Sequence, residues 1–185
     1  MNAAEKLKIS VVDYLEGELI SEIKHEYVNG EVFAMAGVSE QHNTITVNLT
    51  ALLRQHLRGT GCKVFVADMK TRIQFNKENY FYYPDLQVCC QGNDNQRYYK
   101  EAPKLVIEVL SSSTERYDRS EKFDHYRQLS SLEEYILIAQ DKQQIEIYRR
   151  NHHWQPYTYR DNEDFQFQSL DLSLTMASVY EDVEL

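Results

Sequence analysis

Two carboxylic acids stand where the sequence predicts buried strands. Glu108 lies within Lys104-Leu-Val-Ile-Glu-Val-Leu110, a run whose apolar residues suit a strand buried on both faces. An ionised carboxylate there is costly unless a cation, hydrogen bonds or a metal offset its charge. The sequence therefore requires a partner for Glu108.

The second acid, Asp85, follows Pro84 and precedes the apolar run Leu86–Cys90. Proline fixes φ and lacks a donor, so it suits the first position of a strand. We expect Asp85 at the end of the same sheet, beside the strand that carries Glu108. Two neighbouring carboxylates repel each other, and a divalent cation that prefers oxygen ligands relieves the repulsion. The pair predicts a site for Mg²⁺ or Mn²⁺.

A simpler interpretation is a structural salt bridge from Glu108 to Lys122 or Arg119. Asp85 alone is more often a turn residue than a ligand. The metal site is favoured because one lysine would leave the second acid uncompensated.

Hydrophobic periodicity and turn residues indicate the elements that position these acids. Three helices are predicted: one from Ser10 to about Gly17, an amphipathic one over 39–58, and one over 118–129 with Asp118 as its cap. Asn29-Gly30 predicts a hairpin turn of type I′. The other expected segments are strands at Lys63–Val66, Thr71–Phe75, Leu86–Cys90, Lys104–Leu110, Glu134–Ala139, Gln144–Arg149, Trp154–Tyr159 and Phe165–Gln168, loops at Asn76–Asn79 and Gln91–Glu101, and a closing helical turn at Leu174–Tyr180. This order predicts one α/β domain over 1–185, a mixed sheet flanked by helices with added antiparallel strands.

Composition supports a folded cytoplasmic protein. Hydrophobic residues make up 42% of the chain, and no apolar stretch approaches the ~20 residues of a membrane span. Cys62, Cys89 and Cys90 are expected to be reduced core residues. The net charge of −9 counts against tight, non-specific binding of a polyanion, although acids in a metal site would lose their negative charge to the cation.

The acidic pair resembles that of the PD-(D/E)xK nuclease superfamily, in which a Pro-Asp strand start and an acid on a second strand hold the metal. This chain departs from the pattern because Leu110 stands where the superfamily usually has a lysine. In one branch of the superfamily that lysine lies on the next helix, and Lys122 matches its position.

The wider set of motifs resembles the Uma family of restriction endonuclease domains. The matching segments are Tyr27-Val-Asn-Gly-Glu31, His42, Pro84-Asp85, Val106-Ile-Glu-Val-Leu-Ser111, Asp118-Arg119 with Lys122 and Tyr126, and Glu134-Tyr135-Ile-Leu-Ile. The resemblance implies a restriction-endonuclease-like core and Mg²⁺-dependent hydrolysis of phosphodiester bonds, with DNA as the substrate.

The resemblance also implies residue roles. Asp85 and Glu108 would hold the metal together with the backbone carbonyl of Ile107 or Val109. Lys122 would orient the attacking water or stabilise charge on the phosphate. Glu31 is a further candidate ligand, although an exposed hairpin charge is an equal interpretation. His42 and Ser111 are candidates for contacts to phosphate or water, although the simpler interpretation is a local cap or hydrogen bond for His42 and a helix-entry or turn role for Ser111.

Other functions remain open from the sequence. The missing lysine at position 110 and the acidic charge suit a catalytically inactive interaction module on the same scaffold. A hydrolase acting on a smaller phosphoester is a third reading. The aromatic segment Gln144–Tyr159 predicts a homodimer.

Overall fold

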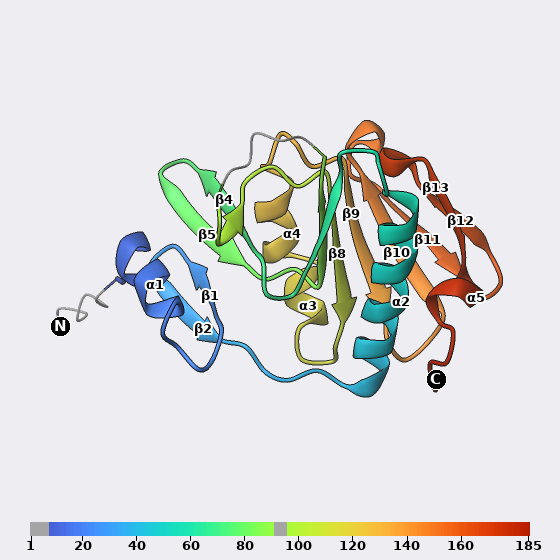
Figure 1. The fold of residues 1–185 in the computed structure, drawn as a ribbon, viewed down its shortest axis with the longest axis horizontal. Helices are drawn as coiled ribbons and strands as arrows, with labels where there is room; N and C mark the ends of the chain where they lie inside the picture. The colour runs from blue at the N-terminus through green and yellow to red at the C-terminus, as the bar shows by residue number, and fades with distance from the viewer. Residues whose placement is uncertain (1–7, 91–95) are drawn as a thin grey trace.

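The computed structural model describes residues 8–90 and 96–185. Its largest sheet has six strands in the order β11-β10-β9-β8-β6-β3. β8 and β9 are parallel and the other neighbours are antiparallel, so the sheet is mixed. The strands of this sheet are β3 (Lys63–Val66), β6 (Leu86–Cys89), β8 (Leu105–Leu110), β9 (Glu134–Ala139), β10 (Gln144–Arg149) and β11 (Pro156–Arg160). The predicted α/β class, a mixed sheet flanked by helices, is confirmed (Figure 1).

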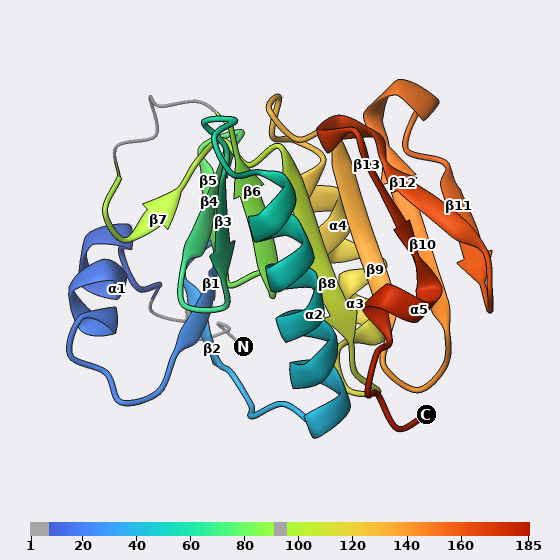
Figure 2. The ribbon, with the colours of Figure 1, turned by 45° about the vertical axis from the view of Figure 1, so that its right-hand side comes forward.

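A second sheet of five strands lies beside the first, in the order β2-β1-β5-β4-β7 (Figures 1 and 2). Its strands are β1 (His25–Val28), β2 (Glu31–Ala34), β4 (Lys70–Phe75), β5 (Glu78–Tyr82) and β7 (Tyr99–Lys100), and β12 (Asp164–Phe167) pairs separately with β13 (Leu172–Thr175). Asn29 and Gly30 connect β1 to β2 with positive φ angles of 46° and 105°, as a type I′ turn requires.

Helices cover both faces of the six-stranded sheet. They are α2 (Glu40–His56) on one face, and α3 (Glu115–Asp118) and α4 (Glu121–Tyr126) on the other. α5 (Met176–Val179) belongs to the same core as α2, whereas α1 (Val11–Glu18) packs through Tyr14 against β1 and β5 of the five-stranded sheet. Single 3₁₀ turns occur at Arg150–His152 and Gln168–Leu170. Every second residue of β8, beginning at Leu105, belongs to the core that contains α2. Val106 and Leu110 belong instead to the core that contains Phe123 of α4. Since side chains alternate along a strand, Glu108 faces α3 and α4.

Several predicted elements are confirmed by the structure. Ser39 caps α2, and its hydroxyl accepts a hydrogen bond from the His42 amide at 3.1 Å. Strands Lys63–Val66, Glu134–Ala139 and Gln144–Arg149 have the predicted bounds. None of the helices in the two described ranges is long and apolar enough to cross a membrane.

The predicted helix over 118–129 is wrong, because α3 and α4 are separate and Asp118 ends the first rather than capping the second. Ser120 has φ −122° and ψ −100°, outside the helical region. The carbonyl of Asp118 accepts a hydrogen bond from the buried Tyr135 hydroxyl at 2.9 Å, which takes the place of helical pairing at the break.

Three further segments differ from expectation. The predicted loop Asn76–Asn79 is a two-residue turn, with Asn76 and Lys77 at positive φ, followed by the unpredicted strand β5. Within the predicted loop Gln91–Glu101, residues 99–100 form β7, and residues 91–95 lie outside the described part. The closing helical turn is shorter than predicted, because Leu174 and Thr175 belong to β13.

The prediction of reduced cysteines is wrong for two of the three. Cys62 and Cys90 form a disulfide, and Cys89 is free and buried. The antiparallel register places Lys63 opposite Cys89, so the two flanking cysteines meet at the end of the β3–β6 ladder. Such pairing depends on register between strands, which the spacing of cysteines along the chain does not determine.

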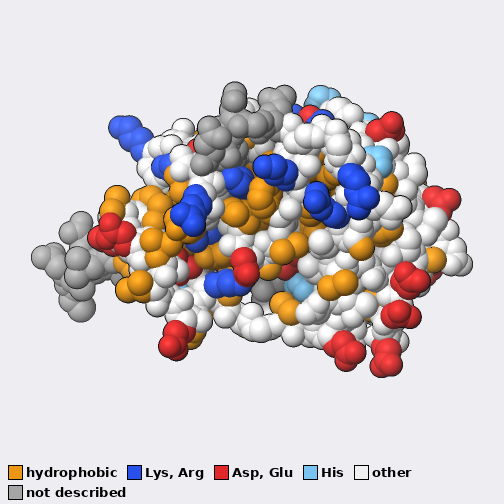
Figure 3. Space-filling view, in the orientation of Figure 1, with side chains coloured by type: hydrophobic (Ala, Val, Ile, Leu, Met, Phe, Trp, Pro, Cys, Tyr) orange, Lys and Arg blue, Asp and Glu red, His pale blue; other side chains and the backbone are white. Residues whose placement is uncertain are grey.

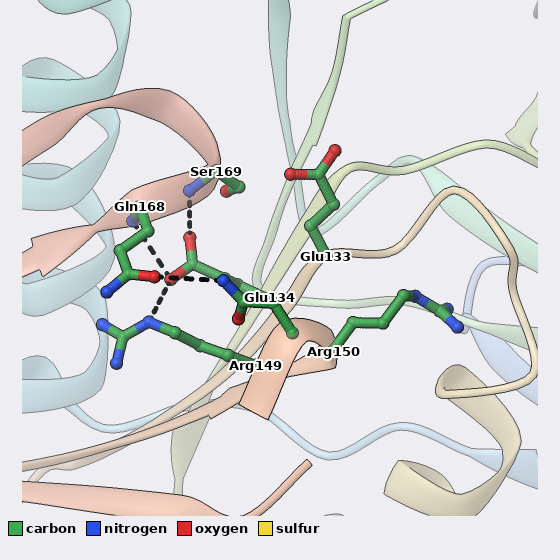
Figure 4. A pocket seen from close by; sticks show the side chains of 7 residues that line it. Glu133, Glu134, Arg149, Arg150, Gln168 and Ser169 are labelled. Carbon is green, nitrogen blue, oxygen red and sulfur yellow. Dashed lines mark hydrogen bonds and ion pairs between the residues drawn. The ribbon is translucent and has the colours of Figure 1, made fainter. Parts of the chain in front are cut away.

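A buried ion pair joins β9 to β10. The carboxylate of Glu134 accepts hydrogen bonds from Arg149 Nε at 2.9 Å and from the amides of Gln168 and Ser169 at 3.1 and 2.8 Å (Figure 4). These groups line a cavity of about 350 Å³. Because Arg149 neutralises the Glu134 carboxylate and two backbone amides complete its hydrogen bonding, this cluster is a structural connection between the six-stranded sheet and the 3₁₀ turn at Gln168–Leu170.

Candidate active site

A cavity of about 500 Å³ contains most of the acids that the sequence singled out. Its walls come from β1, the end of β2 with the segment that leads to α2, the start of α2, Asp85 just before β6, the end of β8, and helices α3 and α4. The acidic and basic residues that line it are Glu26, His42, Asp85, Glu108, Asp118 and Lys122, and Tyr83 and Tyr117 line it as well. Elements from both large sheets therefore contribute charged groups to one cavity.

Asp85 is fixed at the start of β6 by hydrogen bonds to both carboxylate oxygens. The Val109 amide donates to Oδ2 at 2.7 Å, and His42 Nε2 lies 2.9 Å from Oδ1. Leu86 pairs with Ile107 as the last step of the β6–β8 ladder, so the Asp85 side chain occupies the position of the next pairing. The Ser39 cap orients the first turn of α2 and with it His42.

Glu108 is 3% exposed and its Oε1 atom accepts no hydrogen bond. Lys122 Nζ lies 3.0 Å from that oxygen, close enough for charge attraction but without hydrogen-bond geometry. Burial raises the pKa of Glu108 well above its ordinary value, against the opposing effect of Lys122. The carboxyl group is thus incompletely satisfied by the groups around it.

Lys122 places a positively charged ammonium group among the carboxylates of the cavity. Its ammonium lies 3.2 Å from Glu26 and 3.6 Å from Asp118, in addition to its contact with Glu108. Burial acts to lower the pKa of Lys122, but the carboxylates of Glu108 and Glu26 outweigh it and raise that pKa well above its ordinary value. The ring of Tyr82 lies 5.4 Å from the ammonium. The lysine therefore stays protonated.

The charges around Lys122 do not balance. With Asp85, four carboxyl groups line the cavity against one ammonium, and burial also raises the pKa of Asp118. Such a surplus of buried acid is relieved by a further cation or by protonation.

The donor set fits Mg²⁺. Asp85 and the incompletely satisfied Glu108 would supply hard oxygen ligands, and Val109 also lines the cavity. Within residues 8–90 and 96–185, no three His, Cys, Asp or Glu residues form a complete metal-binding group. Mg²⁺ is commonly held by one or two carboxylates, water and substrate phosphate rather than by a protein cage.

Some of the other residues predicted from the sequence line this cavity and some do not. His42 and Val109 line the cavity, and Ser111 lines it as part of a turn in which its hydroxyl bonds Ser113 and Thr114. Neither Ile107 nor Glu31 lines it. The acid that the hairpin contributes is Glu26 on β1.

Sequence reasoning missed Glu26 and gave Asp118 a different role. Asp118 stands four residues before Lys122, a spacing that brings side chains together on a helix and that could have suggested the ion pair. Glu26 had a weaker signal, because its position over the cavity depends on how the five-stranded sheet packs against the six-stranded one.

Comparison with known proteins shows the family of the chain. A family profile described as "Uma2: Putative restriction endonuclease" matches residues 11–177. An uncharacterized protein of Synechocystis sp. is 35% identical over 176 residues, which cover 94% of this chain and 92% of that protein. A second Synechocystis protein is 35% identical over 145 residues, covering 77% of this chain and 81% of its own length.

A solved structure shows the same fold. It is a crystal structure described as a "putative nuclease belonging to DUF820" from Anabaena variabilis. It superimposes with a TM-score of 0.72 at 16% sequence identity, covering 86% of this chain and 91% of that one. The resemblance noted from the motifs is confirmed by the profile match, and the chain belongs to the Uma2 family of restriction-endonuclease-like proteins.

Proposed function

We propose that this protein is a Mg²⁺-dependent endonuclease that hydrolyses phosphodiester bonds of DNA. The observation that carries the proposal is the Glu108 carboxyl group, buried beside Asp85 with an oxygen that accepts no hydrogen bond. A single ammonium, Lys122, faces this excess of acid. The family and the fold add a nuclease-like scaffold to that local chemistry.

Each residue has a role that follows from its contacts. Asp85 and Glu108 would hold the ion, and His42 would fix the Asp85 carboxylate through their 2.9 Å contact. When bound, Mg²⁺ would polarise the phosphate and lower the pKa of a coordinated water. Lys122 would hold the attacking water or stabilise negative charge on the phosphate, while Glu26 and Asp118 keep its ammonium in position.

The charge distribution allows a polyanion to approach despite the net charge of −9. On the face shown in Figure 3, Lys and Arg side chains form a band across the middle, while many Asp and Glu side chains lie along the right-hand and lower edges. Local positive potential of this kind attracts phosphate even on an acidic protein. We expect DNA affinity to be modest and to fall as salt concentration rises.

The test compares cleavage of plasmid and single-stranded DNA by the wild type, Asp85→Asn and Glu108→Gln, with Mg²⁺ or Mn²⁺. Both isosteric variants should lose at least about 100-fold in rate, since each removes a charged ligand. Glu133→Gln is the matched control, because Glu133 is a half-exposed carboxylate paired with Lys104 outside this cavity. Equal rates in the wild type and both site variants would defeat the proposal.

A second candidate, an inactive interaction module, is favoured by one contact. Lys122 already sits 3.0 Å from Glu108, where it partly compensates the charge without any metal. A thermal-shift titration separates the two candidates. If the protein binds Mn²⁺ at the site, a Mn²⁺ concentration of about 100 times the dissociation constant raises the free energy of unfolding by about 2.7 kcal/mol, and Asp85→Asn removes this gain. An inactive module shows no difference in stabilisation by Mn²⁺ between the wild type and Asp85→Asn.

A further inference from the structure

Three side chains form a hydrogen-bonded chain from the wall of the candidate active site to the place where α4 packs against β5. The hydroxyl of Tyr82 lies 2.9 Å from the hydroxyl of Tyr117 and 2.7 Å from Nδ1 of His125. Tyr117 lines the cavity, Tyr82 is fully buried, and His125 is partly exposed. The chain of hydrogen bonds therefore begins at the cavity and ends near solvent.

The hydroxyl of Tyr82 has one proton and two neighbours, so the two hydrogen bonds depend on each other. If Tyr82 donates to His125 Nδ1, Tyr117 must donate to Tyr82 and has no proton left for the cavity. If Nδ1 carries a proton, it donates to Tyr82, and Tyr82 donates to Tyr117. The proton of Tyr117 is then free to point into the cavity.

Both tyrosines keep their protons throughout the neutral range. Burial is the main reason that the pKa of Tyr82 and that of Tyr117 are raised above the ordinary value. The Tyr117 hydroxyl also lies within the electrostatic influence of Glu26 and Lys122. It is thus a neutral donor beside the charged groups of the site.

We propose that Tyr117 donates a hydrogen bond to a non-bridging oxygen of the bound phosphodiester, and that Tyr82 and His125 are positioning residues that set the direction of this bond. The inference rests on the proposed nuclease function, which supplies the phosphodiester. No covalent bond changes at these three residues. Their effect is to present a preoriented donor where negative charge develops on the phosphate.

The protonation of His125 is governed by groups on two elements. Its ring stacks on Tyr80 of β5 at 3.8 Å, and Glu78, also on β5, accepts a hydrogen bond from the Tyr80 hydroxyl. Glu121 and Asp124 of α4 favour the charged ring, but burial outweighs them and lowers the pKa of His125. At neutral pH the ring is therefore uncharged, and binding of phosphate beside Tyr117 must select the tautomer with Nδ1 protonated.

The test uses two readouts on the full-length protein. Turnover of single-stranded DNA with Mn²⁺ should fall about 100-fold in Tyr117→Phe and about 10-fold in Tyr82→Phe and His125→Asn, mainly in kcat. Tyr148→Phe is the matched control, because the Tyr148 hydroxyl donates to Glu146 at 3.4 Å and Tyr148 does not line the cavity. It should retain wild-type turnover.

The second readout is independent of cleavage. In ¹⁵N-histidine-labelled protein with Ca²⁺, adding the dinucleotide TpT should move the His125 signals toward the Nδ1-protonated form, and Tyr117→Phe should abolish the change. Cleavage that is unaffected by Tyr117→Phe, or TpT binding that leaves His125 unchanged, overturns this inference alone. A wild type that neither cleaves DNA nor binds TpT defeats the proposed function with it.

Discussion

Replacing Lys122 by methionine should destabilise the protein strongly, and more at pH 8 than at pH 5. Lys122 is 6% exposed, and its ammonium lies 3.0, 3.2 and 3.6 Å from the carboxylates of Glu108, Glu26 and Asp118. Removing one partner from a buried ion pair costs about 3–5 kcal/mol, because the remaining charge is left uncompensated. We expect the loss at pH 8 to fall in this range.

The pH dependence follows from the carboxyl groups that remain. Burial already raises the pKa values of Glu108 and Asp118, and Lys122 opposes that rise. Without the ammonium both pKa values rise further. A carboxyl group whose pKa is higher in the folded than in the unfolded state favours folding at low pH, and this advantage is lost as pH rises through the folded-state pKa. The cost of Lys122→Met should therefore be smallest near the ordinary pKa of 4.5 for Glu108 and grow as the pH is raised above it.

Urea unfolding followed by the fluorescence of Trp154 measures this effect, since the indole packs 5.9 Å from Phe123 of α4. Lys104→Met is the matched control. Lys104 lies 3.5 Å from Glu133 in a partly exposed pair, for which we expect a loss below about 1 kcal/mol and little pH dependence. A Lys122→Met variant that loses no more than this control at pH 8 would refute the account of a buried, charge-compensating lysine.

Three other outcomes follow from the structure. His42→Ala should weaken Mn²⁺ binding about 10- to 100-fold by isothermal calorimetry, because it releases the Asp85 carboxylate, and His42→Gln should weaken it less. Arg149→Met should cost about 3–5 kcal/mol in urea unfolding by leaving Glu134 buried without its cation (Figure 4), whereas the Glu134→Met, Arg149→Met double variant should recover much of that loss. Thiol titration of the unfolded protein should find one free thiol before reduction and three after it, and three before reduction would contradict the Cys62–Cys90 bond.

The strands that the sequence predicted well are those with purely local signals. Glu134–Ala139 and Gln144–Arg149 are apolar or alternating runs separated by a polar turn, and their bounds match the prediction. Strand β5 was missed because Tyr80-Phe-Tyr-Tyr83 is aromatic without a break, so neither alternation nor helical spacing is visible in it. Its identity as a strand comes from pairing with β4 and β1.

The residues of the candidate site likewise fall into those with a local signal in the sequence and those without one. Asp85 and Glu108 could be found from sequence because each breaks a local rule, an acid at a strand start and an acid inside an apolar strand. Lys122 could be found only through the family resemblance. Glu26 breaks no local rule, since an acid on a short hairpin strand is ordinary, and only the packing of the two sheets brings it 3.2 Å from the Lys122 ammonium.

The leucine at position 110 has a structural explanation that connects the site to α4. Glu108 and Leu110 are two residues apart on β8 and so share a face, and Leu110 is buried there in the aromatic core with Phe123 and Tyr126 of α4. A lysine at 110 would place its stem in that core. Because α4 covers this face of β8, Lys122 on that helix reaches the Glu108 carboxylate from the helix side. The position of the ammonium therefore depends on the packing of a six-residue helix rather than on β8 alone. Substitutions that loosen α4 should for this reason impair the site before they unfold the sheet.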